Sequence, residues 1–256
     1  MSKKKPQKKN YMSFNHPDLK NSFSTLFANI RFAAVDKPNK SIVVTSVGMD
    51  EGKSTVASNL ALSIVNAGQT CVLVDADLRK HTLCKMLNVN AQFGLYSLLS
   101  GNCAIYDAIT KTNIEGLFFI DCEPDIPNPA DIVGSERFAS LVEYLENNFD
   151  YVILDTPPLI SFVDGALVSS FADATLLVVR EGKTKKKDIK NAVAQLDQAN
   201  ANIIGTILTF SSDTTESDYY YAYYNKEGKR VRKSSKSATN MQNTVDATSM
   251  NQNLNS

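Results

Sequence analysis

Residues 41–55 read Ser-Ile-Val-Val-Thr-Ser-Val-Gly-Met-Asp-Glu-Gly-Lys-Ser-Thr. The last four, Gly52–Thr55, follow a β-branched run and precede a helical pattern in which Val56, Leu60 and Ile64 share one face. This is the setting of a phosphate-binding loop, in which backbone N–H groups at the start of a helix hold phosphate oxygens. The stretch therefore predicts that the chain binds a nucleotide through its phosphates.

Each polar residue of the loop has an expected task. Lys53 would reach the β- and γ-phosphates, and the Ser54 hydroxyl would be a ligand of Mg²⁺. The residues expected to contact the nucleotide are Asp50, Glu51, Gly52, Lys53, Ser54 and Thr55. The strict GxxxxGK[ST] pattern has glycine at position 47, where this chain has Val47 followed by Gly48, so the loop is a variant.

Apolar runs of strand length recur along the chain, with helix-like stretches between several of them. They cover residues 42–45, 71–74, 117–120, 151–154, 175–179 and 203–208. This alternation predicts an α/β protein with a doubly wound, mainly parallel sheet and helices on both faces. Helices are also expected at 135–148, where Ser135 would be the N-cap, and at 188–198.

Composition limits the classes of protein that remain. The 256 residues are 43 % hydrophobic, enough for one substantial core, and 27 Lys and Arg balance 27 Asp and Glu. No excess of charge favours nucleic acid or an anionic membrane as the main partner. No run reaches the ~18 apolar residues of a membrane span, so we expect a cytoplasmic protein. The cysteines form no CxxC pair, and His16 and His81 have no partner at metal-ligand spacing, so no metal site is expected among them.

Three segments are expected. Residues 1–17 would be a basic, flexible N-terminus, residues 18–212 a nucleotide-binding domain, and residues 213–256 a flexible tail rich in Ser, Thr, Asn and Gln. The tail contains five tyrosines within positions 219–224. Both ends lack the apolar residues needed to form a core, so we expect them to be disordered alone.

Aspartates follow two of the expected strands. Asp75 and Asp77 end the run that begins at Cys71, and Asp155 ends the run that begins at Tyr151. Since parallel strands carry their carboxyl ends to one edge of the sheet, these side chains should meet the phosphate-binding loop there. Phosphoryl transfer needs carboxylates that hold Mg²⁺ and one that receives the acceptor's proton. We expect catalytic roles for Lys53, Asp75, Asp77 and Asp155, and a metal site made by Ser54, Asp77 and Asp155.

These motifs together resemble those of the bacterial tyrosine kinases of capsule and exopolysaccharide synthesis, relatives of the MinD and ParA ATPases. Gly52–Thr55 resembles the family's Walker A motif, residues 72–79 its additional acidic motif, and residues 151–158 its Walker B motif. The resemblance covers roughly residues 19–224 and implies the P-loop NTPase fold. From the order of the residues in the acidic motif, Asp75 is the candidate for receiving the tyrosine proton, and Arg79 is a candidate ion-pair partner.

The resemblance also implies an activity and partners. The protein would be an ATP-dependent, Mg²⁺-dependent tyrosine kinase that phosphorylates its own C-terminal cluster in trans. The acceptors would be Tyr219, Tyr220, Tyr221, Tyr223 and Tyr224. A separate transmembrane adaptor of the polysaccharide export system would activate the kinase and hold it at the inner face of the plasma membrane.

Two departures from the family pattern stand out. The family has Pro-Gly-Glu before the Walker Gly-Lys, where this chain has Met49-Asp50-Glu51; aspartate tolerates a left-handed backbone better than most residues. The family's Glu-x-x-Arg-x-x-Arg motif, which assembles a ring of subunits, is replaced by Asn21, Ser24 and Phe27. A ring would then be weakened, or would depend on apolar contacts of Phe23, Phe27 and Phe32 in this helix.

Two alternatives share the predicted fold. The first is an ATPase switch like ParA or MinD, which resemble one another in a lysine near the loop start where this chain has Gly48. The second is a non-catalytic regulator of the same membrane complex, which the presence of Lys53, Asp77 and Asp155 disfavours. Only a kinase would transfer phosphate from ATP to tyrosine.

Overall fold

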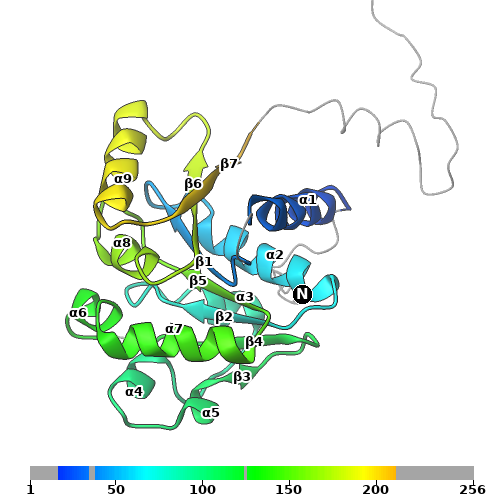
Figure 1. The fold of residues 1–256 in the computed structure, drawn as a ribbon, viewed down its shortest axis with the longest axis vertical. Coiled ribbons are helices and arrows are strands. Elements are labelled where there is room, and N and C mark those ends of the chain that lie inside the picture. The colour runs from blue at the N-terminus through cyan, green and yellow to red at the C-terminus, as the bar shows by residue number, and fades with distance from the viewer. Residues whose placement is uncertain (1–16, 35–37, 124–125, 212–256) are drawn as a thin grey trace, which may run out of the picture. The chain divides into compact units, whose positions relative to one another are not determined.

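The computed structural model describes residues 17–34, 38–123 and 126–211. Within these residues seven strands form one sheet in the order β3-β4-β2-β5-β1-β6-β7, and all neighbours are parallel except β3 and β4 (Figure 1). The strands are β1 (Ser41–Ser46), β2 (Cys71–Asp75), β3 (Thr110–Lys111), β4 (Leu117–Ile120), β5 (Tyr151–Asp155), β6 (Ala174–Arg180) and β7 (Ile203–Thr209). The expected strands and the mainly parallel sheet are confirmed.

The helices of the described residues range from one turn to more than four. They are α1 (Pro17–Ala33), α2 (Lys53–Asn66), α3 (Leu83–Leu87), α4 (Leu95–Leu99), α5 (Ile105–Ala108), α6 (Pro129–Val133), α7 (Glu136–Asn148), α8 (Asp164–Ser169) and α9 (Lys186–Gln198). Ser135 is the predicted N-cap of α7, and its hydroxyl accepts a hydrogen bond from the Phe138 N–H at 3.2 Å. Gly68 follows α2 with a φ of 83°, the left-handed conformation expected of a glycine after a helix.

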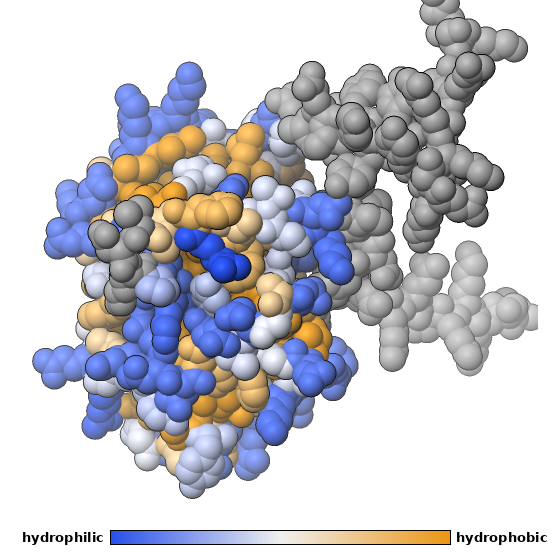
Figure 2. Space-filling model, turned by 45° about the vertical axis from the view of Figure 1, so that its right-hand side comes forward, coloured by the Kyte–Doolittle hydropathy of each residue, from blue (hydrophilic) through white to orange (hydrophobic). Residues whose placement is uncertain are grey.

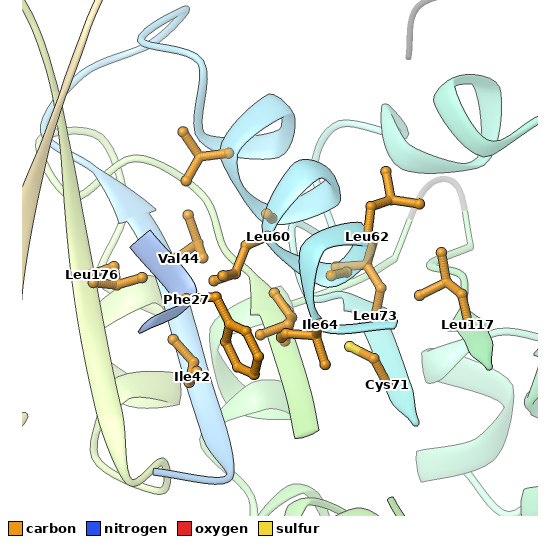
Figure 3. Close-up of a cluster of buried hydrophobic side chains, with 14 of the residues drawn as sticks. Phe27, Ile42, Val44, Leu60, Leu62, Ile64, Cys71, Leu73, Leu117 and Leu176 are labelled. Carbon is orange, nitrogen blue, oxygen red and sulfur yellow. The ribbon is translucent and has the colours of Figure 1, made fainter. Parts of the chain in front are cut away.

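Both faces of the sheet are covered, as the uninterrupted apolar strands predict. Strands β1 and β2 are buried along their whole length, whereas the edge strand β7 alternates between half-buried and exposed residues. On one face α1 and α2 pack over β1, β2 and β5 (Figure 1). Figure 3 shows this core, in which Leu60 and Ile64 of α2 lie among Ile42, Val44 and Leu73 of the strands. Helices α7 and α9 cover the opposite face.

Helix α1 uses one of its phenylalanines for the protein's own core. Phe27 is 5 % exposed, and its ring meets that of Tyr151 edge to face with a centroid distance of 5.1 Å. Figure 3 shows Phe27 pointing toward the sheet. The expectation that Phe27 supports a ring of subunits is therefore wrong, because burial against the sheet hides it. Phe32, on the same helix, is 81 % exposed.

The surface in Figure 2 mixes hydrophilic and hydrophobic residues, with the hydrophilic ones projecting around the outline. Scattered apolar residues are ordinary on soluble domains and define no binding surface by themselves. In the part of the chain that the structure describes, no helix has the length and hydropathy needed to cross a bilayer.

Candidate functional site

The predicted phosphate-binding loop lies between β1 and α2, at the carboxyl edge of the sheet. Its backbone turns through two left-handed residues, Asp50 with a φ of 57° and Gly52 with a φ of 91°. The expectation that aspartate would adopt this conformation is thus met. The Val47 N–H donates to the Val178 carbonyl at 3.2 Å, which ties the start of the loop to β6. The N–H groups of the first turn of α2 have no side-chain cap, so they remain available to an anion.

Glu51 anchors the loop to β7 and to the segment that follows β6. It is only 2 % exposed. Its Oε1 accepts a hydrogen bond from the Thr184 hydroxyl at 2.6 Å, and its backbone carbonyl accepts one from the Thr209 hydroxyl at 2.7 Å. Residues more than 130 positions away in sequence therefore fix the loop's shape. Glu51 therefore fixes the loop through its contacts with Thr184 and Thr209 and also lines the cavity.

We expect Thr184→Val to loosen the loop. The change removes the donor to Glu51 Oε1 but keeps the size of the side chain, leaving a buried carboxylate with one partner fewer. Such a loss costs about 1–3 kcal/mol, so thermal unfolding should occur several degrees lower and nucleotide affinity should fall. Calorimetry and nucleotide titration measure both, with the exposed Thr206→Val of β7 as control. Equal stability of the two variants would contradict the anchoring role.

Lys53 lies at the centre of the expected catalytic cluster. Its Nζ is 2.8 Å from Asp77 Oδ2, 3.5 Å from Asp155 Oδ2 and 3.3 Å from the Ser54 hydroxyl. Burial opposes the lysine's charge, but Asp155 and Asp77 outweigh it and raise the pKa of Lys53 above its usual value. The structure therefore brings together a cation, two carboxylates and a hydroxyl from α2, β5 and the end of β2.

Asp75 lies deeper than its neighbour. It is 1 % exposed; its Oδ1 accepts from the Asp77 N–H at 3.2 Å, and Oδ2 has no hydrogen-bond partner among the described residues. Burial first, and then the charge of Asp155, raise the pKa of Asp75 well above its usual range. Burial also raises the pKa of Asp155, against the opposing charge of Lys53. The cluster therefore favours protonation of one carboxyl at acidic pH.

We expect Asp75→Asn to stabilise the nucleotide-free protein at pH 7. A carboxyl group whose pKa is higher in the folded state than in the unfolded state contributes fully to the stability of the fold below its unfolded-state pKa, near 4. That contribution is lost as the pH rises through the folded-state pKa. The amide cannot ionise, so the variant should gain about 1 kcal/mol at pH 7, roughly 2–4 °C, and nothing near pH 4. Thermal melts across pH test this, with the exposed Asp197→Asn as control. A gain that does not depend on pH would contradict the explanation.

A cavity of about 390 Å³ opens in front of the loop. Its lining includes Met49 to Thr55, Asp77, Arg79, Lys80, Thr82, Met86, Pro158 and Phe162. Arg79 Nη2 is 3.1 and 3.2 Å from the two oxygens of the buried Asp164, and its guanidinium lies 4.0 Å from the centroid of the Phe162 ring. Arg79 is therefore an ion-pair partner that also forms part of the cavity wall.

The residues present fit a magnesium nucleotide. Asp155 is buried; its Oδ2 forms an ion pair with Lys53 Nζ at 3.5 Å, and its Oδ1 has no hydrogen-bond partner among the described residues. An unsatisfied buried carboxylate beside a hydroxyl suits a hard cation, which prefers oxygen ligands. The open N-terminus of α2 suits the phosphates. The expected site residues of the loop and of the strand ends all lie at the carboxyl edge of the sheet. The tyrosines of positions 219–224 are outside the described residues.

Sequence reasoning missed the supports of the site. Thr184 and Thr209, which hold Glu51, and Asp164, which holds Arg79, carry no motif of their own. The sequence gives one weak signal at Asp164, an acidic residue at the start of an apolar helical stretch. The structure shows that Asp164 is buried, with 2 % of its surface exposed. Their roles depend on contacts between segments that are far apart in sequence.

Comparison with known proteins places this chain in a family. A family model described as an AAA domain matches residues 40–204. The tyrosine-protein kinase CpsD of Streptococcus agalactiae is 35 % identical over 212 residues, which are 82 % of this chain and 90 % of the relative. The kinase domain of the Escherichia coli tyrosine kinase ETK superposes with a TM-score of 0.73 at 27 % identity, covering 84 % and 85 % of the two chains.

The cell-division ATPase MinD of Pyrococcus furiosus is more distant, with a TM-score of 0.59 at 22 % identity over 69 % of this chain and 74 % of its own. That likeness shows the fold alone, the P-loop NTPase fold that the sequence predicts. The similarity to the kinases is stronger in both sequence and structure. The chain belongs to the bacterial tyrosine-protein kinase family, within the proteins that share the AAA domain.

Proposed function

We propose that this protein is an ATP-dependent tyrosine kinase that phosphorylates its own C-terminal tyrosines in trans and thereby regulates the synthesis and export of a capsular or exopolysaccharide. The observation that carries the proposal is the position of Lys53 between Asp77 and Asp155, at the start of α2 and beside an open cavity. The family relationship supports tyrosine as the acceptor.

Each site residue has its own proposed role in phosphoryl transfer. Bound Mg-ATP supplies the phosphoryl group and the charge of the metal. Lys53 would neutralise charge on the phosphates. Ser54 and Asp155 would hold the magnesium ion directly or through water, and Asp77 would support its water shell. The tyrosine oxygen forms the new bond to the γ-phosphorus, the bond to the leaving ADP oxygen breaks, and a carboxylate takes the phenolic proton.

Asp77 and Asp75 are both candidates for that carboxylate. Asp77 lines the cavity. Asp75 does not line it, and its Oδ1 orients Asp77 by accepting a hydrogen bond from the Asp77 N–H. This arrangement supports Asp77 as the group that touches the acceptor hydroxyl and Asp75 as the residue that positions it. The motif order alone had favoured Asp75. A pH–rate profile of Asp75→Asn that keeps the wild-type acidic limb would support Asp77.

We also propose a transmembrane adaptor that holds the kinase at the inner face of the membrane and activates it. The test uses the purified full-length chain, labelled ATP and Mg²⁺, with and without the cytoplasmic segment of such an adaptor. Label on tyrosine, increased by the segment, is the expected result. ATP hydrolysis without phosphotyrosine would instead indicate an ATPase switch, and neither activity with or without the segment would indicate a non-catalytic regulator.

A further inference from the structure

His81, Asp121 and Cys122 meet at a point beside, but separate from, the nucleotide cavity. Each offers one ligand atom, and these atoms all lie within 4.8 Å of one another. Cys122 directly follows Asp121 after β4, and His81 belongs to the segment after β2, the strand that pairs with β4. The spacing of 41 residues between His81 and Cys122 hides this group in the sequence.

The geometry of the group points to a thiophilic divalent cation. Cys122 Sγ is 3.6 Å from His81 Nδ1. In a tetrahedral zinc site, bonds of about 2.3 Å to sulfur and 2.0 Å to nitrogen place the two ligand atoms roughly 3.5 Å apart. The observed separation is therefore already that of two ligands of one ion. Small rotations of side chains would bring the third ligand into the same sphere.

The Cys122 thiol donates a hydrogen bond to the Asp77 carbonyl at 3.6 Å, which an ion would replace with a bond to sulfur. Cys122 forms no disulfide, and the residue is 2 % exposed. The Asp121 carboxylate uses Oδ1 to accept the Cys122 N–H at 3.0 Å, which orients the group and leaves Oδ2 as a ligand. His81 Nε2 is buried and has no hydrogen-bond partner among the described residues, and Nδ1 faces the Cys122 thiol.

We propose that His81, Asp121 and Cys122 form a zinc site that is distinct from the magnesium nucleotide site. Imidazole and thiolate select zinc over magnesium, which prefers oxygen ligands alone. On binding, a Zn–S bond forms at Cys122, the thiol proton passes to solvent, and water fills the fourth position. No redox change takes place.

The site would tie two parts of the fold together. The Cys122 thiol lies 3.6 Å from the Asp77 carbonyl. The segment from Asp77 to Thr82 supplies a wall of the cavity, including Arg79 and Lys80. An ion held by His81 and the end of β4 would fasten this segment to the sheet. The inference does not depend on kinase activity, because it concerns metal binding alone.

Titration of the metal-free, full-length protein with Co²⁺ tests the site through absorbance. One equivalent should give a thiolate-to-cobalt charge-transfer band with the intense visible absorption of a tetrahedral ion, and Zn²⁺ should remove it. Saturating Mg-ADP should leave the band in place, because the nucleotide site contains no thiol among its lining residues. Absence of the band, or its loss on adding Mg-ADP, would overturn the proposal.

Two variants assign the ligands. Cys122→Ala should abolish the band, and His81→Gln, at a half-buried position that tolerates polar change, should weaken Co²⁺ affinity by about 100-fold. Cys103→Ala is the matched control and should bind as the wild type does. Circular dichroism confirms folding of each variant. A band that persists in Cys122→Ala would assign the thiolate to another cysteine and overturn the site, as would unchanged affinity in His81→Gln.

Discussion

Lys53→Met is expected to lower tyrosine phosphorylation by about 1000-fold or more while the chain remains folded. Methionine keeps most of the length of lysine but removes the charge that lies 2.8 Å from Asp77 and 3.5 Å from Asp155. Losing one preorganised charge at a phosphoryl-transfer site costs at least two to three orders of magnitude in rate. The measurement is incorporation of label from ATP into tyrosine.

The variant also leaves buried carboxylates without their cation. Asp75, Asp77 and Asp155 would then repel one another, so we expect some loss of stability at pH 7 that shrinks toward acidic pH as the carboxyls protonate. Circular dichroism and a thermal melt establish that the folded state persists at the assay temperature. Lys190→Met, at an exposed position of α9, is the matched control. Undiminished phosphotyrosine in folded Lys53→Met protein would exclude the mechanism.

The sequence predicted the sheet and the site's central residues because both depend on short, local patterns. Uninterrupted apolar strands indicated a sheet covered on both faces, and parallel strands necessarily carry Asp75 and Asp155 to the same edge as Lys53. A conformational prediction also held at Asp50, because the left-handed backbone depends on the residue itself.

What could not be predicted depends on long-range packing. The short helices α3 to α6 and the two-residue strand β3 span too few residues for a periodic pattern to appear. Phe27 was expected to contact another subunit because it occupies a position of the family's ring motif, whereas contact with Tyr151 of β5 buries it. The anchoring of Glu51 by Thr184 and Thr209 joins residues far apart in the chain, and no spacing rule describes it.

The tyrosine cluster lies outside the described residues, but the strand that precedes it in the sequence ends near the nucleotide site. The last described residues leave β7 beside the phosphate-binding loop, where the Thr209 hydroxyl donates to the Glu51 carbonyl at 2.7 Å. Eight positions separate Ser211 from Tyr219, a length that spans at most about 28 Å when extended. Each added phosphate carries about −1.5 to −2 charges at pH 7. Several of them would be repelled by the carboxylates of a neighbour's site, so phosphorylation should release the tail and loosen assembly.

Replacing Tyr219, Tyr220, Tyr221, Tyr223 and Tyr224 by phenylalanine is expected to remove most phosphotyrosine, roughly tenfold or more, and to leave nucleotide binding unchanged. Tyr106→Phe is the control, since this tyrosine is 76 % exposed within the folded domain.

Mixing the five-phenylalanine chain, which retains Lys53, with a tagged Lys53→Met chain, which retains the tyrosines, tests transfer between molecules. Label on the tagged chain is expected, because an intact site would meet an intact tail only in trans. Mass spectrometry that places the phosphates mainly on Tyr96, Tyr106 or Tyr144 would show that the tail is not the substrate, and an unlabelled tagged chain would show that transfer occurs within one molecule.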